Sequence, residues 1–140
     1  METLFAQSDK SIVLKAFNQQ FFEFLDDIVS IYPENVEILT ARETFGTFKR
    51  MNPTSLIKVW YSRIYMTYRE QIEAGNIDFF MEKDYGEDLN NSDPNNMRRV
   101  LEMIDKVRGP LRDMGPENRS CAVKYIKNLS KLSVAYANLS

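Results

Sequence analysis

The chain contains no histidine among its 140 residues. This absence removes the commonest general base, the serine and cysteine triads that depend on imidazole, and most zinc and di-iron sites. A single cysteine, Cys121, excludes an internal disulfide and indicates a reducing compartment. With no histidine to activate its thiol, we expect Cys121 to be a small buried or half-buried residue rather than a nucleophile.

Glycine and proline are also scarce, at five residues each, which argues against a loop-rich or all-β protein. No apolar run approaches the roughly 18–20 residues that span a bilayer. The first residues lack the basic-then-apolar layout of a signal peptide, and no glycine-rich phosphate loop is present. We therefore expect an intracellular protein that is not secreted, has no membrane segment, and uses neither a cofactor nor a small-molecule substrate.

Apolar residues recur every three or four positions along almost the whole chain, as in amphipathic helices. The first predicted helix begins with Ser8 or Asp9 as its N-cap and ends at Ile31. Pro33 stops it, because a proline disfavours helical geometry in the residue before it. A second predicted helix follows over residues 34–50.

The third predicted helix has the clearest start and end. Asn52 can cap it, Pro53 suits its first position, and Gly75 closes it. Apolar and aromatic side chains cover more than one of its faces, which is typical of a helix at the centre of a bundle. Its rings can instead form a ligand or partner surface, although core packing is the favoured interpretation.

Two more helices complete the prediction. Asp93-Pro94 opens the fourth, which Gly109-Pro110 ends, and Gly115-Pro116 precedes the last. The predicted fold is therefore an all-α compact bundle of about five helices, with an acidic connection between helices three and four. At this length we expect one domain covering residues 1–140.

Charge is distributed unevenly along the chain. Residues 76–93 contain six acidic side chains and one lysine, for a net charge of −5, whereas residues 94–140 contain nine basic and four acidic side chains, for +5. The whole chain carries only −2. Such an uneven distribution of charge is informative about binding partners and docking, and it does not predict the fold.

The candidate interaction surface is drawn from both charged blocks: Asp84, Glu87, Asp88, Arg98, Arg99, Lys124, Lys127 and Lys131. The three lysines fall on the side of the last helix opposite its apolar stripe. A solvated helix face explains them without any function. Alternatively, the two blocks attract each other within one chain or between chains, although each exposed ion pair contributes only about 0–1 kcal/mol.

Metal binding was tested on the acidic block. An EF-hand loop starting at Asp88 fails, because its sixth position is Asp93 instead of glycine and its twelfth is Arg99 instead of glutamate. A catalytic site would need a metal ion held by carboxylates only, those of Asp84, Glu87 and Asp88. We expect no metal and no enzymatic activity.

Nucleic-acid binding is the alternative function. It would use basic side chains of the C-terminal third to contact phosphates: Arg98, Arg99, Arg119, Lys124, Lys127 and Lys131. The sequence pI of about 5.3 argues against general polyanion binding. Nucleic acid is therefore the less favoured partner.

Four stretches resemble a group of small, uncharacterised helical proteins of large nucleocytoplasmic DNA viruses of algae and protists: FNQQFFEFLDDIVSIYPEN, MNPTSLIKVWYSRI, EQIEAGNIDFFMEKDYGEDL and YIKNLSKLSVAYANLS. The likeness extends from about Lys10 to Tyr136. It implies a viral protein acting in the host cytoplasm or the virion, and it implies no activity or site residues. Together these observations predict a non-enzymatic protein-interaction or virion/assembly protein, with a protein partner or self-association.

Overall fold

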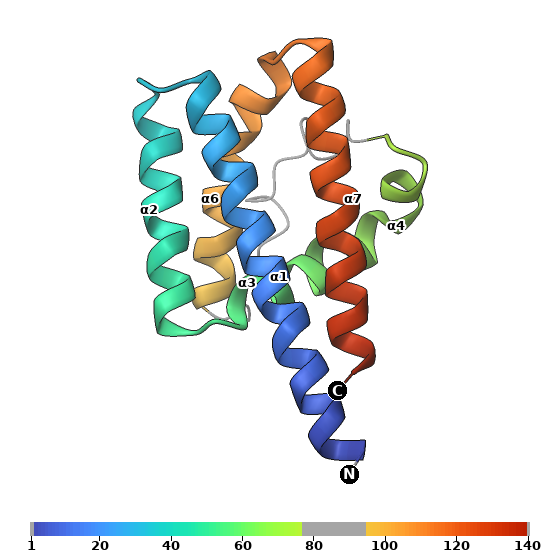
Figure 1. Cartoon of the computed structure of the whole chain (residues 1–140). Helices are drawn as coiled ribbons and strands as arrows, with labels where there is room; N and C mark the ends of the chain where they lie inside the picture. The colour runs from blue at the N-terminus through green and yellow to red at the C-terminus, as the bar shows by residue number, and fades with distance from the viewer. Residues whose placement is uncertain (1, 77–94, 140) are drawn as a thin grey trace.

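The computed structural model describes residues 2–76 and 95–139, and the regular structure of these residues is entirely helical. Figure 1 shows five helical rods: α1, α2, a segmented rod made of α3, η1 and α4, then α6 and α7. The predicted all-α fold of about five helices is confirmed. The acidic connection expected after the third helix falls on residues outside the described part, apart from Asn76.

Helix α1 spans Glu2–Ile31, so it begins earlier than the sequence predicted. Ser8 and Asp9, the predicted N-caps, lie inside it, and that prediction was wrong. The residues before them contain no glycine or proline and several good helix formers, so nothing stops the helix from extending. The predicted end at Ile31 is confirmed.

Helix α2 spans Val36–Met51, two residues later than predicted at its start. The side-chain oxygen of Asn35 caps it by accepting a hydrogen bond of 3.1 Å from the backbone N–H of Ile38. The backbone N–H of Asn52 closes the other end by donating to the carbonyl of Phe48 at 2.8 Å.

The third rod is continuous but not uniform, with three segments: α3 (Ser55–Val59), η1 (Trp60–Tyr65) and α4 (Met66–Glu73). The predicted N-cap at Asn52 was wrong, because the N-cap is Thr54, which makes no side-chain capping bond; the Asn52 side-chain oxygen instead accepts from the backbone N–H of Thr54 at 3.1 Å, in the turn before the helix. The helix itself begins after Pro53, which lies in the preceding turn. The segment η1 is a π-helix, in which each turn is wider than in an α-helix.

The rod bends and ends at identifiable residues. Tyr68 has non-helical angles, φ −121° and ψ 27°, which place a kink inside α4. Gly75 has a φ of +78°, a conformation that glycine adopts without the steric penalty of a Cβ. The predicted end of this helix at Gly75 is therefore confirmed.

Helix α6 spans Asn95–Asp113 and corrects a second prediction. Gly109 and Pro110 do not end it but lie inside its last turns. Val107 and Met114 are buried on either side of the pair, and the Pro110 carbonyl accepts a hydrogen bond of 3.1 Å from the Tyr32 hydroxyl. Packing on both sides thus keeps the chain helical despite the missing N–H of the proline.

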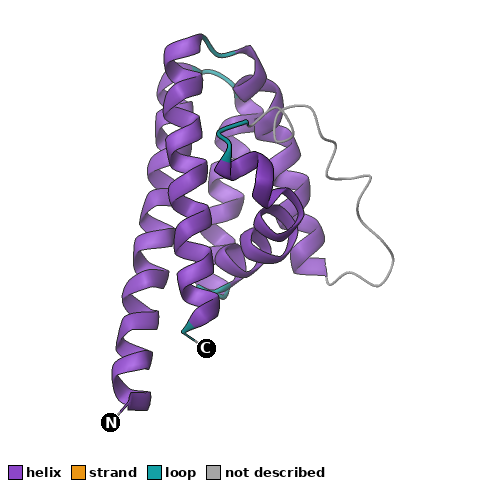
Figure 2. Ribbon diagram, turned by 90° about the vertical axis from the view of Figure 1, so that its right-hand side faces the viewer, coloured by secondary structure: helices purple, strands orange, loops and turns teal. Residues whose placement is uncertain are grey.

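Helix α7 spans Pro116–Asn138, with Gly115 as its N-cap, as the sequence predicted. It runs antiparallel to α1, which also packs on α2, and α2 packs in turn on α6 (Figures 1 and 2). The segmented rod contacts all four other rods. Its predicted central position is confirmed.

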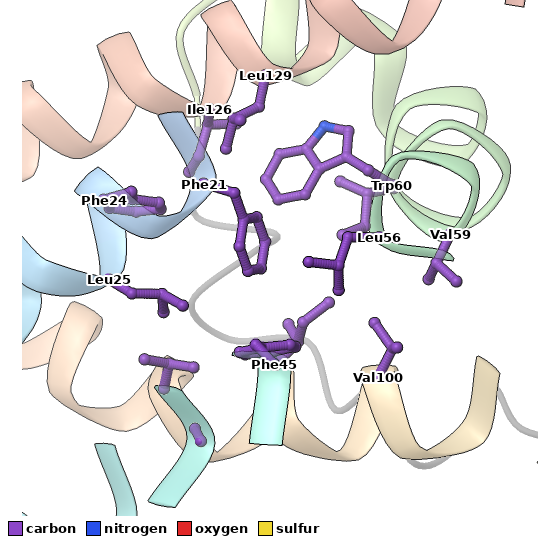
Figure 3. Close-up of a cluster of buried hydrophobic side chains, with 14 of the residues drawn as sticks. Phe21, Phe24, Leu25, Phe45, Leu56, Val59, Trp60, Val100, Ile126 and Leu129 are labelled. Carbon is purple, nitrogen blue, oxygen red and sulfur yellow. The ribbon is translucent and has the colours of Figure 1, made fainter. Parts of the chain in front are cut away.

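The core is built around aromatic side chains from three rods. The ring of Phe21 meets Phe45 edge to face at 5.0 Å and Trp60 at 6.4 Å between centroids (Figure 3). Ile126 and Leu129 of α7 close the cluster on the side of the indole. One connected set of buried side chains thus joins all five rods.

Candidate functional site

The residues of the predicted interaction surface do not form one site in the described part of the chain. Asp84, Glu87 and Asp88 lie outside it. Arg98 is half-buried and Arg99 exposed near the start of α6, where the Arg99 guanidinium lies 5.6 Å from the centroid of the Phe48 ring. Arg99 therefore belongs to the side of the molecule where α6 meets α2.

The three lysines lie on α7 instead. Lys124 and Lys131 are exposed, while Lys127 is half-buried. Lys127 and Lys131 line a hollow of about 380 Å³ between α7 and the segmented rod. The lysine stripe is thus only in part a plain solvated face, because two of its members border a concave surface.

The other walls of this hollow mix apolar and polar groups. Ile72 of α4 and Val134 of α7 supply aliphatic surface, and Tyr65 of η1 supplies a ring. The Tyr65 hydroxyl donates a long hydrogen bond of 3.4 Å to Glu73. Burial, followed by the charge of Glu73, raises the pKa of the Tyr65 phenol, so the hydroxyl remains a donor at neutral pH.

We define this surface as the α4–α7 hollow: Tyr65, Ile72, Glu73, Lys127, Ser130, Lys131 and Val134. Its shape depends on the π-helical segment, a feature often found at functional sites. The Trp60 side chain at the start of that segment donates from its indole nitrogen to the hydroxyl of Ser130, at 3.0 Å and out of contact with solvent. Tyr61 and Tyr65 stack on each other at 6.0 Å between centroids.

The turn after α4 lies directly beside the hollow. The Lys127 ammonium approaches Gly75 so closely that a Cβ added there would lie 3.5 Å from the nitrogen. The acidic block of the sequence begins at the next residue, Asn76. The α4–α7 hollow is therefore basic at the point where the chain enters its most acidic segment.

A larger hollow, of about 630 Å³, follows the outer face of α1. Phe22 lies in it, half-buried, with the Lys49 ammonium 5.4 Å and the Arg42 guanidinium 5.6 Å from its ring centroid. Arg42 also pairs with Asp26 through two hydrogen bonds. Both signs of charge thus border this second hollow.

A third, smaller hollow of about 140 Å³ contains the thiol. Cys121 is exposed, so the expectation of a buried or half-buried cysteine was wrong. Nearby, the Tyr125 hydroxyl donates a hydrogen bond of 2.7 Å to Asp27, and its ring stacks on Phe24 at 4.9 Å. That hydrogen bond first, then burial and the Asp27 charge, raise the pKa of Tyr125 to about 12.

Among the described residues, no group of three or more His, Cys, Asp or Glu side chains is placed to hold a metal ion. Within the same residues, none of the helices combines the length and apolarity needed to cross a membrane. Tyr65, Glu73 and the outer face of α1 did not stand out in the sequence. The many aromatic residues of the third predicted helix were the one sequence feature that indicated a binding surface at the α4–α7 hollow.

The chain matches no model of a known protein family, no curated protein and no solved structure.

Proposed function

We propose that this chain is a non-enzymatic helical protein that binds other proteins, and that the α4–α7 hollow receives an acidic segment of a partner. The observation that carries the proposal is the joint position of Lys127 and Lys131 at the edge of a hollow with aliphatic walls. Two ammonium groups beside apolar surface match a partner segment in which carboxylates flank an apolar side chain.

The walls define what such a segment would contact. Carboxylates of the partner would pair with Lys127 and Lys131, and an apolar side chain would cover Ile72 and Val134. Each exposed ion pair contributes about 0–1 kcal/mol, and apolar burial adds about 25 cal/mol per Å². Binding of this kind is moderate in affinity, and it weakens as added salt screens the charges.

A viral setting fits this mode of action. The resemblance to helical proteins of large DNA viruses favours a role in the virion or in its assembly, where proteins act by contacting other copies and other chains. Segregated charge along the sequence also favours head-to-tail contact between copies, with the acidic block of one on the basic hollow of another.

A binding titration tests the proposal. The probe is a synthetic peptide of residues 76–93, which carries −5 and contains aromatic side chains. We expect the full chain to bind it at low salt, and we expect Lys127→Gln with Lys131→Gln to weaken binding at least about tenfold. The matched control replaces Lys58 and Lys106, exposed lysines on α3 and α6, by glutamine. It changes the net charge by the same amount.

Two results would refute the proposal. One is no binding at low ionic strength, where charge attraction is strongest. The other is equal weakening by the two double variants, since this would show that overall charge, and not the α4–α7 hollow, attracts the peptide.

Nucleic-acid binding is retained as a second candidate because Lys124, Lys127 and Lys131 lie on successive turns of one helix. Arg98 and Arg99 do not extend this row, since they lie on α6, and the Arg99 guanidinium lies over the Phe48 ring of α2. Gel shifts with single- and double-stranded DNA and RNA at low salt test it. Binding that Lys124→Gln abolishes would support this candidate, and no shift with any of the four would end it.

A further inference from the structure

The outer face of α1 carries a pattern of charge in which Lys15 and Glu23 make no ion pair with the described residues. The hollow on this face extends from Ser11 to Asp26, about four helical turns or about 22 Å. Its centre is Gln19, which is exposed and donates to Glu23 at 3.2 Å. In Figure 1, α1 lies between α2 and α7, and on this face Lys15, Gln19 and Glu23 are exposed.

Opposite charges are placed at equal distances from that centre. Lys15 lies four residues before Gln19 and Glu23 lies four residues after it, and both are exposed. They are two helical turns apart, about 12 Å along the axis, so they do not reach each other within one helix. Along α1 itself the face is therefore basic in its first half and acidic in its second, while Lys49 and Arg42 of α2 lie beside Phe22 in that second half.

The apolar residues of the face follow a similar symmetry. Leu14 and Phe22, both half-buried in the hollow, lie four residues before and four residues after Asn18. Ile12, which is 62% exposed, lies one turn before Lys15 on the same face. Apolar surface thus accompanies the charges on both sides of the centre.

We propose that two copies of the chain associate through this face, with their α1 helices antiparallel and a two-fold axis near Asn18 and Gln19. An antiparallel pairing brings Lys15 of each copy to Glu23 of the second copy. It also brings Leu14 near Phe22 of the second copy. A two-fold axis makes every such contact twice. The basic half of each α1 helix then faces the acidic half of the α1 helix in the second copy.

A parallel pairing of the same faces would be disfavoured, because it brings like charges together. It would set Lys15 beside Lys15 and Glu23 beside Glu23 of the second copy, and like charges at an interface disfavour association. One helix face per copy is also a small contact area compared with stable dimers. The expected dimer is therefore weak, antiparallel and dependent on concentration.

This interface is separate from the proposed binding site. The α4–α7 hollow lies on other helices and shares no residue with the α1 face. Each copy of such a dimer keeps its own hollow, so the assembly would present two sites for an acidic partner. The dimer does not depend on the proposed function, and each is tested with different variants.

Sedimentation equilibrium of the full chain at concentrations up to about 1 mM tests the dimer. Lys15→Glu and Glu23→Lys each place like charges opposite each other twice, so we expect each to weaken dimerisation at least about tenfold. The double variant, with the two charges exchanged, restores both ion pairs and is expected to dimerise like the original. Glu37→Lys, an exposed reversal on α2, is the matched control and should have no effect.

Mixing the two single variants gives the sharpest outcome. One then has an acidic α1 face and the other a basic one, so the mixture should form a heterodimer although each variant alone dimerises at least about tenfold more weakly. Three results would each overturn the proposal: a chain that is monomeric throughout, single variants that dimerise unchanged, or a mixture that stays monomeric. Lys127→Gln with Lys131→Gln should leave the dimer intact.

Discussion

The indole N–H of Trp60 donates a hydrogen bond of 3.0 Å to the hydroxyl of Ser130, in the core of the bundle. Both residues are 2% exposed, so neither group has water as an alternative partner. The bond joins the start of the π-helical segment to the middle of α7. It therefore fixes the relative position of the two elements whose side chains form the α4–α7 hollow.

Removing this bond should cost stability. We expect Ser130→Ala to lower the free energy of unfolding by about 1–3 kcal/mol, because the indole N–H then stays buried without an acceptor. Urea denaturation followed by circular dichroism measures the loss. Ser120→Ala, an exposed serine of the same helix, is the control and should change stability by less than about 0.5 kcal/mol. Equal stability of the two variants would contradict the role given to the bond.

Two glycines should respond to alanine with opposite signs. Gly75 has a φ of +78°, so Gly75→Ala should destabilise the chain by about 1–2 kcal/mol. Gly109 lies inside α6, and no atom lies within 4 Å of an added Cβ, so Gly109→Ala should stabilise it by about 0.5–1 kcal/mol. Thermal unfolding of the two variants measures both. A destabilised Gly109→Ala would argue that α6 breaks at this point.

The Tyr125–Asp27 contact predicts a stability change at high pH. The folded-state pKa of Tyr125 is raised from 10.0 to about 12. The stability it contributes is therefore fully present below about pH 10 and is lost as the pH rises toward about 12. Unfolding titrations of the original chain and of Tyr125→Phe should converge over this interval. Parallel curves at all pH values would contradict the coupling.

A conservative change at the acceptor separates charge from hydrogen bonding. Asp27→Asn keeps an oxygen that accepts from Tyr125 but removes the negative charge, so the pKa of Tyr125 should fall toward its ordinary value. The ultraviolet absorbance of tyrosinate, taken as the difference from Tyr125→Phe, reports this titration. An unchanged titration in Asp27→Asn would show that the carboxylate charge has no part in the raised pKa.

The buried amide of Asn18 should hold α1 against the turn before α3. Its nitrogen donates to the carbonyl of Pro53 at 3.0 Å, and the residue is 4% exposed. Asn18→Ala is expected to cost about 1–3 kcal/mol, because the Pro53 carbonyl loses its donor and a small cavity forms. Gln19→Ala at the exposed neighbour serves as the control. Denaturant midpoints compare them, and similar midpoints would refute this assignment.

Much of the fold could be predicted because local signals and packing agree. Apolar residues recur every three or four positions along the first predicted helix, and four of them on α1 are buried: Phe17, Phe21, Phe24 and Ile28. Gly75 has the conformation that its position suggested. At these positions, the end of a helix or its buried side is determined by a few neighbouring residues in the sequence.

The errors arose where distant residues decide the outcome. Gly109-Pro110 is a stop signal, yet Tyr32 binds the Pro110 carbonyl from far away in the sequence and α6 continues. The π-helical segment was not predicted from the sequence, and its first residue, Trp60, is bound to Ser130 of another helix, 70 residues away. The hollow beside it was therefore not predictable, although two of its lysines were named.

The most direct test of the proposed function is an NMR titration of the isotope-labelled chain with the peptide of residues 76–93 at low salt. We expect the shift changes to concentrate at Tyr65, Ile72, Lys127 and Val134, and added salt to reverse them. Shift changes that concentrate away from the α4–α7 hollow, or none at any peptide concentration, would contradict the proposed function.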